Sequence, residues 1–217
     1  MRLKGKKILI VGLARTGTAV ARYLHPKGSR ITVTDLKTKI QLQSVLKPLS
    51  LYKGIGYKLG GHPPKAFLTS DLIIVSPGVP THLMPLEMAR SKHIPIMSEL
   101  EFSSRLITQP IVAVTGTDGK TTTTMMIGQM LKNANKSAFV GGNIGNPLIN
   151  AVASREKYQA IVAEVSSFQL ELVSQFHPKI AMILNLSTDH LDRHETMEKY
   201  AALKARIFEN QRAADTL

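Results

Sequence analysis

Hydrophobic positions along the chain fall into short runs of branched residues, separated by stretches of mixed polarity. Runs of this length are typical of parallel strands that are buried on both faces. We predict strands at residues 7–11, 31–34, 72–75, 111–114, 137–140, 160–165 and 180–184. Helices are predicted at residues 17–25, after the loop that follows residue 114, and at residues 196–213. This alternation predicts an α/β protein with parallel sheets.

The pattern restarts near the middle of the chain, where a second strand, glycine-rich loop and helix follow one another. A chain of 217 residues, 43% of them hydrophobic, is long enough for two modest cores. We therefore predict one domain at residues 1–108 and another at residues 109–217. Met125, Met126 and Met130 have helical spacing, and we interpret them as core packing rather than as a partner-binding surface.

The composition excludes several kinds of site. Without cysteine the chain has neither disulfides nor thiolate metal ligands, and we expect a reducing, cytoplasmic location. The apolar run after the basic start is too short for a signal peptide, and no segment has the roughly 18 apolar residues of a membrane span. The net charge of +13 favours anionic partners. Because the cations are scattered and aromatic residues make up only 5%, we do not expect nucleic-acid binding.

The first glycine-rich loop, from Gly12 to Gly17, lies between a predicted strand and a predicted helix, as dinucleotide-binding loops do. Asp35 follows at about the distance expected of a carboxylate that binds a ribose hydroxyl. Ala14 replaces the middle glycine, which normally lets the backbone approach a pyrophosphate, and so weakens a nicotinamide interpretation. Another nucleotide, or a tight turn without a ligand, stays open. We predict a Rossmann-like parallel-sheet domain here.

The second loop, residues 115–122, carries a stronger signal for phosphate binding. Its glycines free backbone N–H groups for phosphate oxygens, and the start of the following helix adds positive potential. Lys120 would reach the terminal phosphates of a nucleotide, and the Thr121 hydroxyl would ligate Mg²⁺. Val114 stands where the usual pattern has its first glycine, so the loop is a shortened variant. We predict a P-loop NTPase-like domain that binds ATP through Gly116, Thr117, Asp118, Gly119, Lys120, Thr121 and Thr122.

Glu164 ends an apolar strand and is expected at the carboxyl edge of the second sheet, where open α/β proteins bind ligands. A carboxylate there can ligate Mg²⁺, although acids at strand ends also cap the following helix. The segment from Asp189 to His194 is expected at the same edge. His190 and His194 have the spacing of a zinc pair, but Leu191 stands where a metalloprotease helix has glutamate. We do not expect zinc, and we interpret a histidine here as a ligand or neighbour of Mg²⁺.

Four successive segments resemble the signatures of the Mur ligase family, and the resemblance spans essentially the whole chain. They are residues 115–122, 141–145, 164–171 and 185–194. Residues 166–171, together with residues 76–80, most resemble the members that join D-glutamate to UDP-N-acetylmuramoyl-L-alanine. Another Mur ligase or a folylpolyglutamate-type ligase is the alternative. The resemblance implies an ATP-dependent ligase of peptidoglycan precursor synthesis, in which ATP phosphorylates a carboxylate and an amine then attacks the acyl phosphate.

By this resemblance the first domain binds the UDP part of the substrate rather than NAD. The implied substrate-binding residues are Arg15, Thr16, Asp35, Ser76, Gly78, Asn143 and Ser166. The first three would lie by the uracil, the next two near the pyrophosphate, and the last two against the nucleotide sugar. The family usually has a small hydroxyl residue after the aspartate, where this chain has Leu36.

The same resemblance implies two Mg²⁺ ions. Thr121 and Glu164 would ligate one, His190 would ligate the second, and Lys204 would carry a carbamate that supplies an oxygen ligand. Taken without the resemblance, Lys204 has the pattern of a solvated helix lysine. The implied catalytic residues are Lys120, Glu164, His190 and Lys204. The family commonly has Asn where Asp118 stands, and we expect the Asp118 side chain to turn outward and cap the helix.

The family also has a C-terminal domain that binds the amino acid and closes over ATP, and its central domain extends beyond the position of Leu217. We therefore expect the 217-residue chain to bind the UDP-linked substrate weakly and not to turn over by itself. We expect it to be a monomer.

Overall fold

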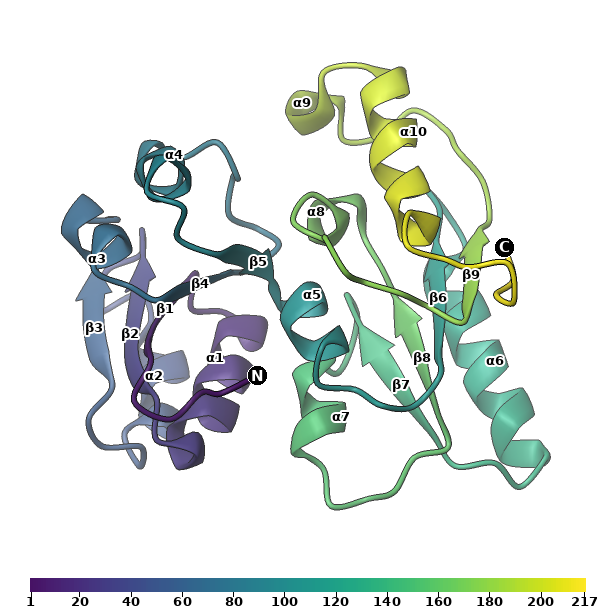
Figure 1. The fold of residues 1–217 in the computed structure, drawn as a ribbon, viewed down its shortest axis with the longest axis horizontal. Helices are drawn as coiled ribbons and strands as arrows, with labels where there is room; N and C mark the ends of the chain where they lie inside the picture. The colour runs from purple at the N-terminus through teal and green to yellow at the C-terminus, as the bar shows by residue number, and fades with distance from the viewer. The chain divides into compact units, whose positions relative to one another are not determined.

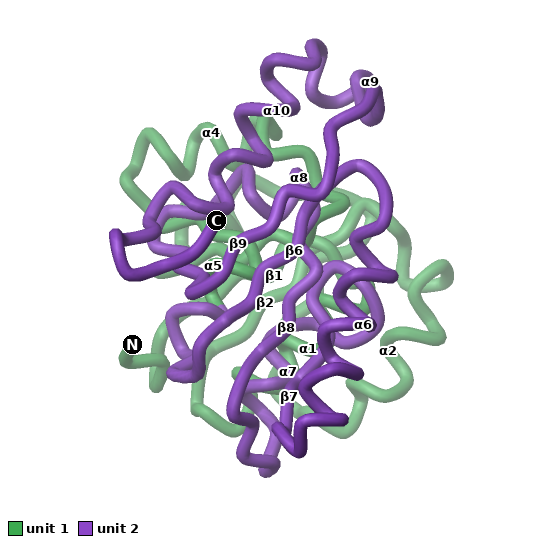
Figure 2. The backbone as a smooth tube through the Cα atoms, turned by 90° about the vertical axis from the view of Figure 1, so that its right-hand side faces the viewer, with its two compact units in different colours: residues 1–102 green, residues 103–217 purple.

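The computed structural model describes all 217 residues, which form two compact units, Met1–Phe102 and Ser103–Leu217 (Figures 1 and 2). Each unit contains one parallel sheet. The predicted α/β class with parallel sheets is therefore confirmed. The units divide within helix α5 (Glu99–Ser104), a few residues before the boundary predicted after residue 108. None of the helices is long and apolar enough to cross a membrane.

The first unit is built on a five-stranded sheet in the order β3-β2-β1-β4-β5. Its strands are β1 (Lys7–Val11), β2 (Arg30–Asp35), β3 (Gly56–Leu59), β4 (Leu72–Val75) and β5 (Ile96–Ser98). Its helices are α1 (Arg15–Leu24), the 3-10 turn η1 (His25–Lys27), α2 (Gln43–Leu49), α3 (Pro64–Leu68) and α4 (Met84–Ser91). Because β1 pairs with both β2 and β4, the strand order reverses there, and the carboxyl ends of β1 and β4 flank the position where such sheets bind ligands.

The second unit is built on a four-stranded sheet in the order β7-β8-β6-β9. Its strands are β6 (Ile111–Thr115), β7 (Ala138–Gly142), β8 (Ala160–Glu164) and β9 (Ile180–Ile183). Its helices are α6 (Lys120–Asn133), α7 (Ile149–Ala153), α8 (Ser167–Leu170), α9 (Leu191–His194), α10 (Met197–Ala205) and the 3-10 turn η2 (Arg206–Phe208). The helix predicted up to residue 213 is thus too long, since α10 ends at Ala205 and only one 3-10 turn follows it.

Helix α6 corrects the interpretation of the methionines as core. Met125, Met126 and Met130 are 56%, 54% and 63% exposed. The helix instead turns small residues toward the sheet: Thr124 is fully buried, and a Cβ on Gly128 would lie 2.5 Å from Val140 Cγ2. Close packing of α6 against β7 therefore depends on Thr124 and Gly128, one helical turn apart, and the methionines lie away from that contact.

Candidate functional site

In the first unit, the loop after β1 is fixed by two polar side chains at the ends of neighbouring strands. Asp35 ends β2, and its carboxylate accepts hydrogen bonds from the backbone N–H groups of Leu13 at 2.6 Å and Lys37 at 2.8 Å. Ser76, which follows β4, donates its hydroxyl to the carbonyl of Gly12 at 2.9 Å. The carboxylate and hydroxyl that we predicted to bind substrate therefore hold this turn in shape.

The glycines of the same loop permit a close approach of backbone. Gly12 has φ of +93°, and a Cβ on Gly17 would lie 2.1 Å from the Gly12 carbonyl oxygen. Arg15 is exposed at the start of α1, and Thr16 next to it is partly exposed. Gly78 is exposed, and a Cβ added to it would meet no atom within 4 Å. The predicted uracil and pyrophosphate residues thus gather at the carboxyl ends of β1, β2 and β4.

In the second unit, the predicted phosphate loop connects β6 to α6 and contains two residues in the left-handed region, Gly116 at φ of +153° and Gly119 at φ of +76°. The Lys120 ammonium donates to the carbonyl of Thr117 at 2.6 Å. Lys120 also begins α6, so the first turn of this helix supplies N–H groups that have no partner within the helix. Together with the Lys120 ammonium, these helix-start N–H groups are a suitable environment for phosphate oxygens.

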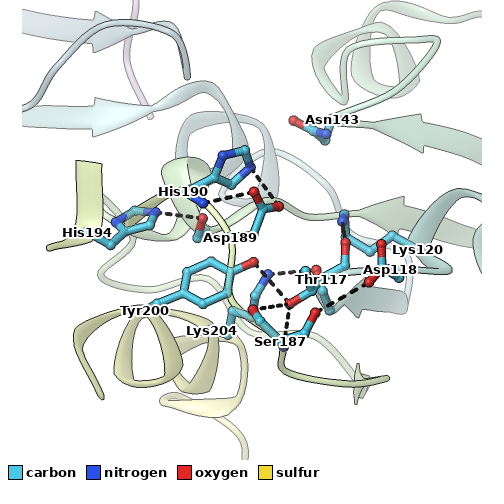
Figure 3. Close-up of polar contacts among 12 residues, drawn as sticks. Thr117, Asp118, Lys120, Asn143, Ser187, Asp189, His190, His194, Tyr200 and Lys204 are labelled. Carbon is cyan, nitrogen blue, oxygen red and sulfur yellow. Dashed lines mark hydrogen bonds and ion pairs between the residues drawn. The ribbon is translucent and has the colours of Figure 1, made fainter. Parts of the chain in front are cut away.

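Asp118 does not cap α6, contrary to the prediction. Gly119 occupies the N-cap position, and no side chain makes a capping hydrogen bond there. The Asp118 carboxylate is exposed and accepts a hydrogen bond from the Ser187 hydroxyl at 3.4 Å (Figure 3). The side chain does face out of the loop, but it contacts the segment after β9 rather than the helix.

Glu164 links three segments at the carboxyl edge of the second sheet. One of its oxygens accepts the Thr121 hydroxyl at 2.7 Å, and the other accepts the Asn143 amide at 3.0 Å. Glu164 itself is only 1% exposed. A Cβ on Gly142 would lie 2.3 Å from the Glu164 carbonyl oxygen, so glycine at the end of β7 is required for this contact. The sequence-predicted residues Thr121, Asn143 and Glu164 are thus brought into one cluster.

Lys204 lies beneath the phosphate loop rather than in solvent. Its ammonium is buried, donates to the Gly116 carbonyl at 2.7 Å and lies 4.4 Å from the centre of the Tyr200 ring (Figure 3). Burial, and then the positive charge of Lys120, lower the pKa of Lys204 to about 8, while Asp189 acts in the opposite direction. A lysine with such a pKa holds a substantial fraction of neutral, nucleophilic amine in mildly alkaline solution.

His190 is not part of the cluster around Glu164. It adopts the left-handed region at φ of 53°, its ring pairs with Asp189 at 3.4 Å, and its side chain is 45% exposed. The ring lies beside Phe168, with 4.8 Å between centroids, and 6.5 Å from the ring of Tyr200. No hydrogen bond joins His190 to Glu164, Thr121 or Lys204.

Ser166, predicted to contact the substrate, forms a capping box with Gln169 at the start of α8. Its hydroxyl accepts a hydrogen bond from the Gln169 backbone N–H at 3.4 Å. The next residue, Ser167, is hydrogen-bonded to His194 Nε2 at 2.9 Å, and both side chains are buried. Burial lowers the pKa of His194. His194, which has the spacing of a zinc pair with His190, therefore joins α9 to α8.

Two residues that sequence reasoning left without a role hold the phosphate loop in place. Asn185 accepts hydrogen bonds from the backbone N–H groups of Thr117 and Asp118 at 3.0 and 2.9 Å. Tyr200 contacts the Thr117 hydroxyl at 3.3 Å. Asn185 follows β9 and so shares the carboxyl edge, and Tyr200 precedes Lys204 by one helical turn. Nothing in the local sequence pattern indicated that either side chain contacts the loop.

The donor chemistry decides whether Mg²⁺ fits. No group of three or more His, Cys, Asp and Glu side chains is close enough to hold a metal ion. The Thr121 hydroxyl and Glu164 carboxylate nevertheless present adjacent oxygens, which are the ligands that Mg²⁺ prefers when phosphates and water complete its shell. These residues fit one Mg²⁺. A cationic Lys204 repels a metal ion, so a second site fits only if that ammonium is converted to a carbamate.

Fold and site together define an α/β protein with a glycine-rich loop at the start of a helix and an acid at the adjacent strand end, an arrangement typical of nucleotide-binding proteins. The MurD-like Mur ligase N-terminal domain matches residues 6–98, and the Mur ligase middle domain matches residues 114–217. The chain belongs to the Mur ligase family.

Curated relatives and solved structures agree with this membership. The chain is 52% identical over 99% of its length to the UDP-N-acetylmuramoylalanine–D-glutamate ligases of Geobacter sp. strain M21 and of Citrifermentans bemidjiense. It spans 47% of the length of each of these relatives. The crystal structure of UDP-N-acetylmuramate–alanine ligase from Thermotoga maritima is 26% identical, with a TM-score of 0.54 over 95% of this chain and 47% of that one.

Proposed function

We propose that this chain is the substrate- and nucleotide-binding part of an ATP-dependent cytoplasmic ligase that joins D-glutamate to UDP-N-acetylmuramoyl-L-alanine. The two relatives that are 52% identical carry that activity in their names. The observation that carries the proposal is the hydrogen bond from Thr121 to Glu164, 2.7 Å long, which sets an acid directly beside the phosphate loop. ATP-driven amide formation needs such a site, because phosphoryl transfer depends mainly on positioning and charge neutralisation.

The phosphate loop is proposed to position ATP. N–H groups at the start of α6 would donate to phosphate oxygens, and the Lys120 ammonium would exchange the Thr117 carbonyl for the terminal phosphates. Asn185 keeps the loop in this shape by accepting from two of its N–H groups. The substrate carboxylate can then attack the terminal phosphorus without a covalent enzyme intermediate.

Glu164 and Thr121 are the proposed Mg²⁺ ligands. Bound Mg²⁺ would neutralise charge on the transferring phosphate. Asn143 donates to the free side of the Glu164 carboxylate and so orients it. We assign the nucleotide sugar to the neighbourhood of Asn143 and Ser166, and we retain His190 and a carbamylated Lys204 as candidate ligands of a second ion.

The first unit is proposed to bind UDP at the carboxyl ends of β1, β2 and β4. Gly12 and Gly17 let the backbone turn tightly there, and Asp35 and Ser76 hold the turn. Arg15 is exposed at the start of α1 and would meet the anionic or uracil part of the ligand. Since Asp35 already accepts from two N–H groups, we expect it to act on the ligand through the loop it holds.

Calorimetric titration of the 217-residue chain tests the substrate class. UDP-N-acetylmuramoyl-L-alanine is expected to bind more tightly than UDP-N-acetylmuramate, and MgATP is expected to bind independently. Arg15→Gln should lower the affinity for the UDP compounds and leave the affinity for MgATP unchanged. Arg105→Gln, which also removes one positive charge, serves as the control. Absence of binding by either UDP compound, with the chain folded by circular dichroism, contradicts the proposal.

The acceptor is tested by joining residues 1–217 to the remaining C-terminal part of the Geobacter relative, which is 52% identical over the shared region. Phosphate release should require ATP and UDP-N-acetylmuramoyl-L-alanine, and should depend on D-glutamate rather than L-alanine or meso-diaminopimelate. Glu164→Gln should abolish it, with Glu156→Gln as the matched control. Release that depends on another amino acid would assign the chain to a different ligase.

A further inference from the structure

The first unit contains a cavity of about 830 Å³ that lies away from the loop described above. It is lined by the first residues of β1 and β2, by β3 and by the segment around α3. Gly12 and Asp35 lie at the carboxyl ends of β1 and β2, whereas the cavity is lined by the first residues of these two strands, at their opposite ends. A volume of this size is within the range of about 300–1,000 Å³ that is usual for small-molecule sites.

The cavity is strongly cationic. Its charged lining residues are Lys7, Arg30, Lys53, Lys58 and Lys65, and His25 is the further titratable group. No aspartate or glutamate lines it. None of the five cationic side chains forms a salt bridge, although Asp71 lies nearby and accepts from the backbone N–H of Lys7. The lining itself therefore supplies no acid to neutralise this positive charge.

The strand register concentrates this charge. Lys7 and Arg30 are direct neighbours across β1 and β2, and Thr32 is the neighbour of Gly56 across β2 and β3. Like charges opposite each other on adjacent strands destabilise a sheet. Parallel sheets are normally covered on both faces, yet Lys7, Arg30 and Lys58 are exposed here. An anion bound between these side chains would remove the repulsion.

The chemistry around the cavity suits phosphate groups. The guanidinium of Arg30 can donate two parallel hydrogen bonds to a phosphate, and the lysines add point charges. Gly54 and Gly56 let a ligand approach the backbone, and the Thr32 hydroxyl has no hydrogen-bond partner within the protein. We propose that this cavity binds a small molecule with two or more phosphate or carboxylate groups, at a site separate from that of the UDP-linked substrate.

Nuclear magnetic resonance titration of the 217-residue chain with pyrophosphate, at about 0.15 M salt, tests the proposal. The backbone amides of Gly54, Gly56 and Ser70 should shift and saturate. Citrate, titrated in parallel, distinguishes a polycarboxylate site from a phosphate site. Amides of the phosphate loop, such as Gly119, report separately on pyrophosphate bound there, so failure of the nucleotide site does not obscure the result.

The double variant Arg30→Gln with Lys58→Gln should weaken the response of Gly54 and Gly56 by about tenfold or more, since one hydrogen bond to a charged group is worth about that factor. The matched control, Arg2→Gln with Lys92→Gln, removes two positive charges from exposed positions outside the cavity. It should bind as the unaltered chain does. Equal weakening in both variants, or no saturable shift of the cavity amides with either anion, would overturn the proposal.

Discussion

The ammonium of Lys204 donates a hydrogen bond of 2.7 Å to the carbonyl of Gly116, which joins α10 to the phosphate loop across 88 residues of sequence. The contact buries a cation under a loop proposed to bind triphosphate. It also brings Lys204 close enough to Lys120 for that charge to lower its pKa. The Lys204 amine is therefore held directly against the loop that is proposed to bind phosphate.

We predict that Lys204 forms a carbamate. Because its pKa is lowered to about 8, about half of the amine is neutral near that pH and able to attack CO₂. In ¹³C-labelled bicarbonate at mildly alkaline pH, the chain should show a carbamate carbonyl resonance that is absent from Lys204→Arg. Lys199→Arg, which alters an exposed lysine on the same helix, should retain it. A resonance that survives in Lys204→Arg would disprove the assignment.

Gly17→Ala should destabilise the chain by roughly 1–3 kcal/mol, the usual cost of overpacking. The added Cβ would meet the Gly12 carbonyl oxygen at 2.1 Å, and backbone cannot move away as a flexible side chain can. Gly61→Ala is the control, because its Cβ would have no atom within 4 Å and its φ is not in the left-handed region. Urea denaturation measures both. Equal free energies of unfolding for the two variants would contradict the close packing of α1 on its loop.

His62 is predicted to make the first unit sensitive to acid. The Thr34 hydroxyl donates to the Gly61 carbonyl, so His62 Nδ1 donates to Thr34 Oγ1. Burial lowers the pKa of His62 below its ordinary 6.5, although Asp35 opposes this. The unfolded chain then binds the proton more strongly, and this contribution to stability is lost as pH falls below about 6.5.

Urea denaturation at about pH 7.5 and pH 5.5 tests this proton linkage. From pH 7.5 to pH 5.5, the free energy of unfolding should fall more for the unaltered chain than for His62→Gln. The difference should be at most about 1.4 kcal/mol per pH unit. His82→Gln removes an exposed histidine and should track the unaltered chain at both pH values. A difference between His62→Gln and the unaltered chain that does not change with pH would mean that His62 binds protons equally in both states.

Local pattern predicted the central strands well because they are apolar on both faces. The predicted runs at residues 7–11 and 72–75 coincide with β1 and β4. Strand β3 was not predicted, since Gly56–Leu59 lies at the edge of the sheet and alternates exposed and half-buried positions without an apolar run. The short strand β5 likewise gives too few residues for a periodic signal.

The local sequence pattern did not predict contacts between segments that are distant in the sequence. Lys204 has the pattern of a solvated lysine along α10, and only the fold shows that it is buried under Gly116. The methionines of α6 were misassigned because Thr124 and Gly128, not the largest apolar residues, face the sheet. Close approach of backbones selects small residues, and hydrophobicity alone does not identify that face.

The affinity of the chain for ATP, measured by calorimetry with and without Mg²⁺, tests the central claim that Thr121 and Glu164 form a metal site beside the phosphate loop. Glu164→Gln should lower the affinity for MgATP by about 10–100-fold and leave that for metal-free ATP nearly unchanged. Glu156→Gln, at an exposed position, should match the unaltered chain. If Glu164→Gln binds MgATP as tightly as the unaltered chain, the proposed site is wrong.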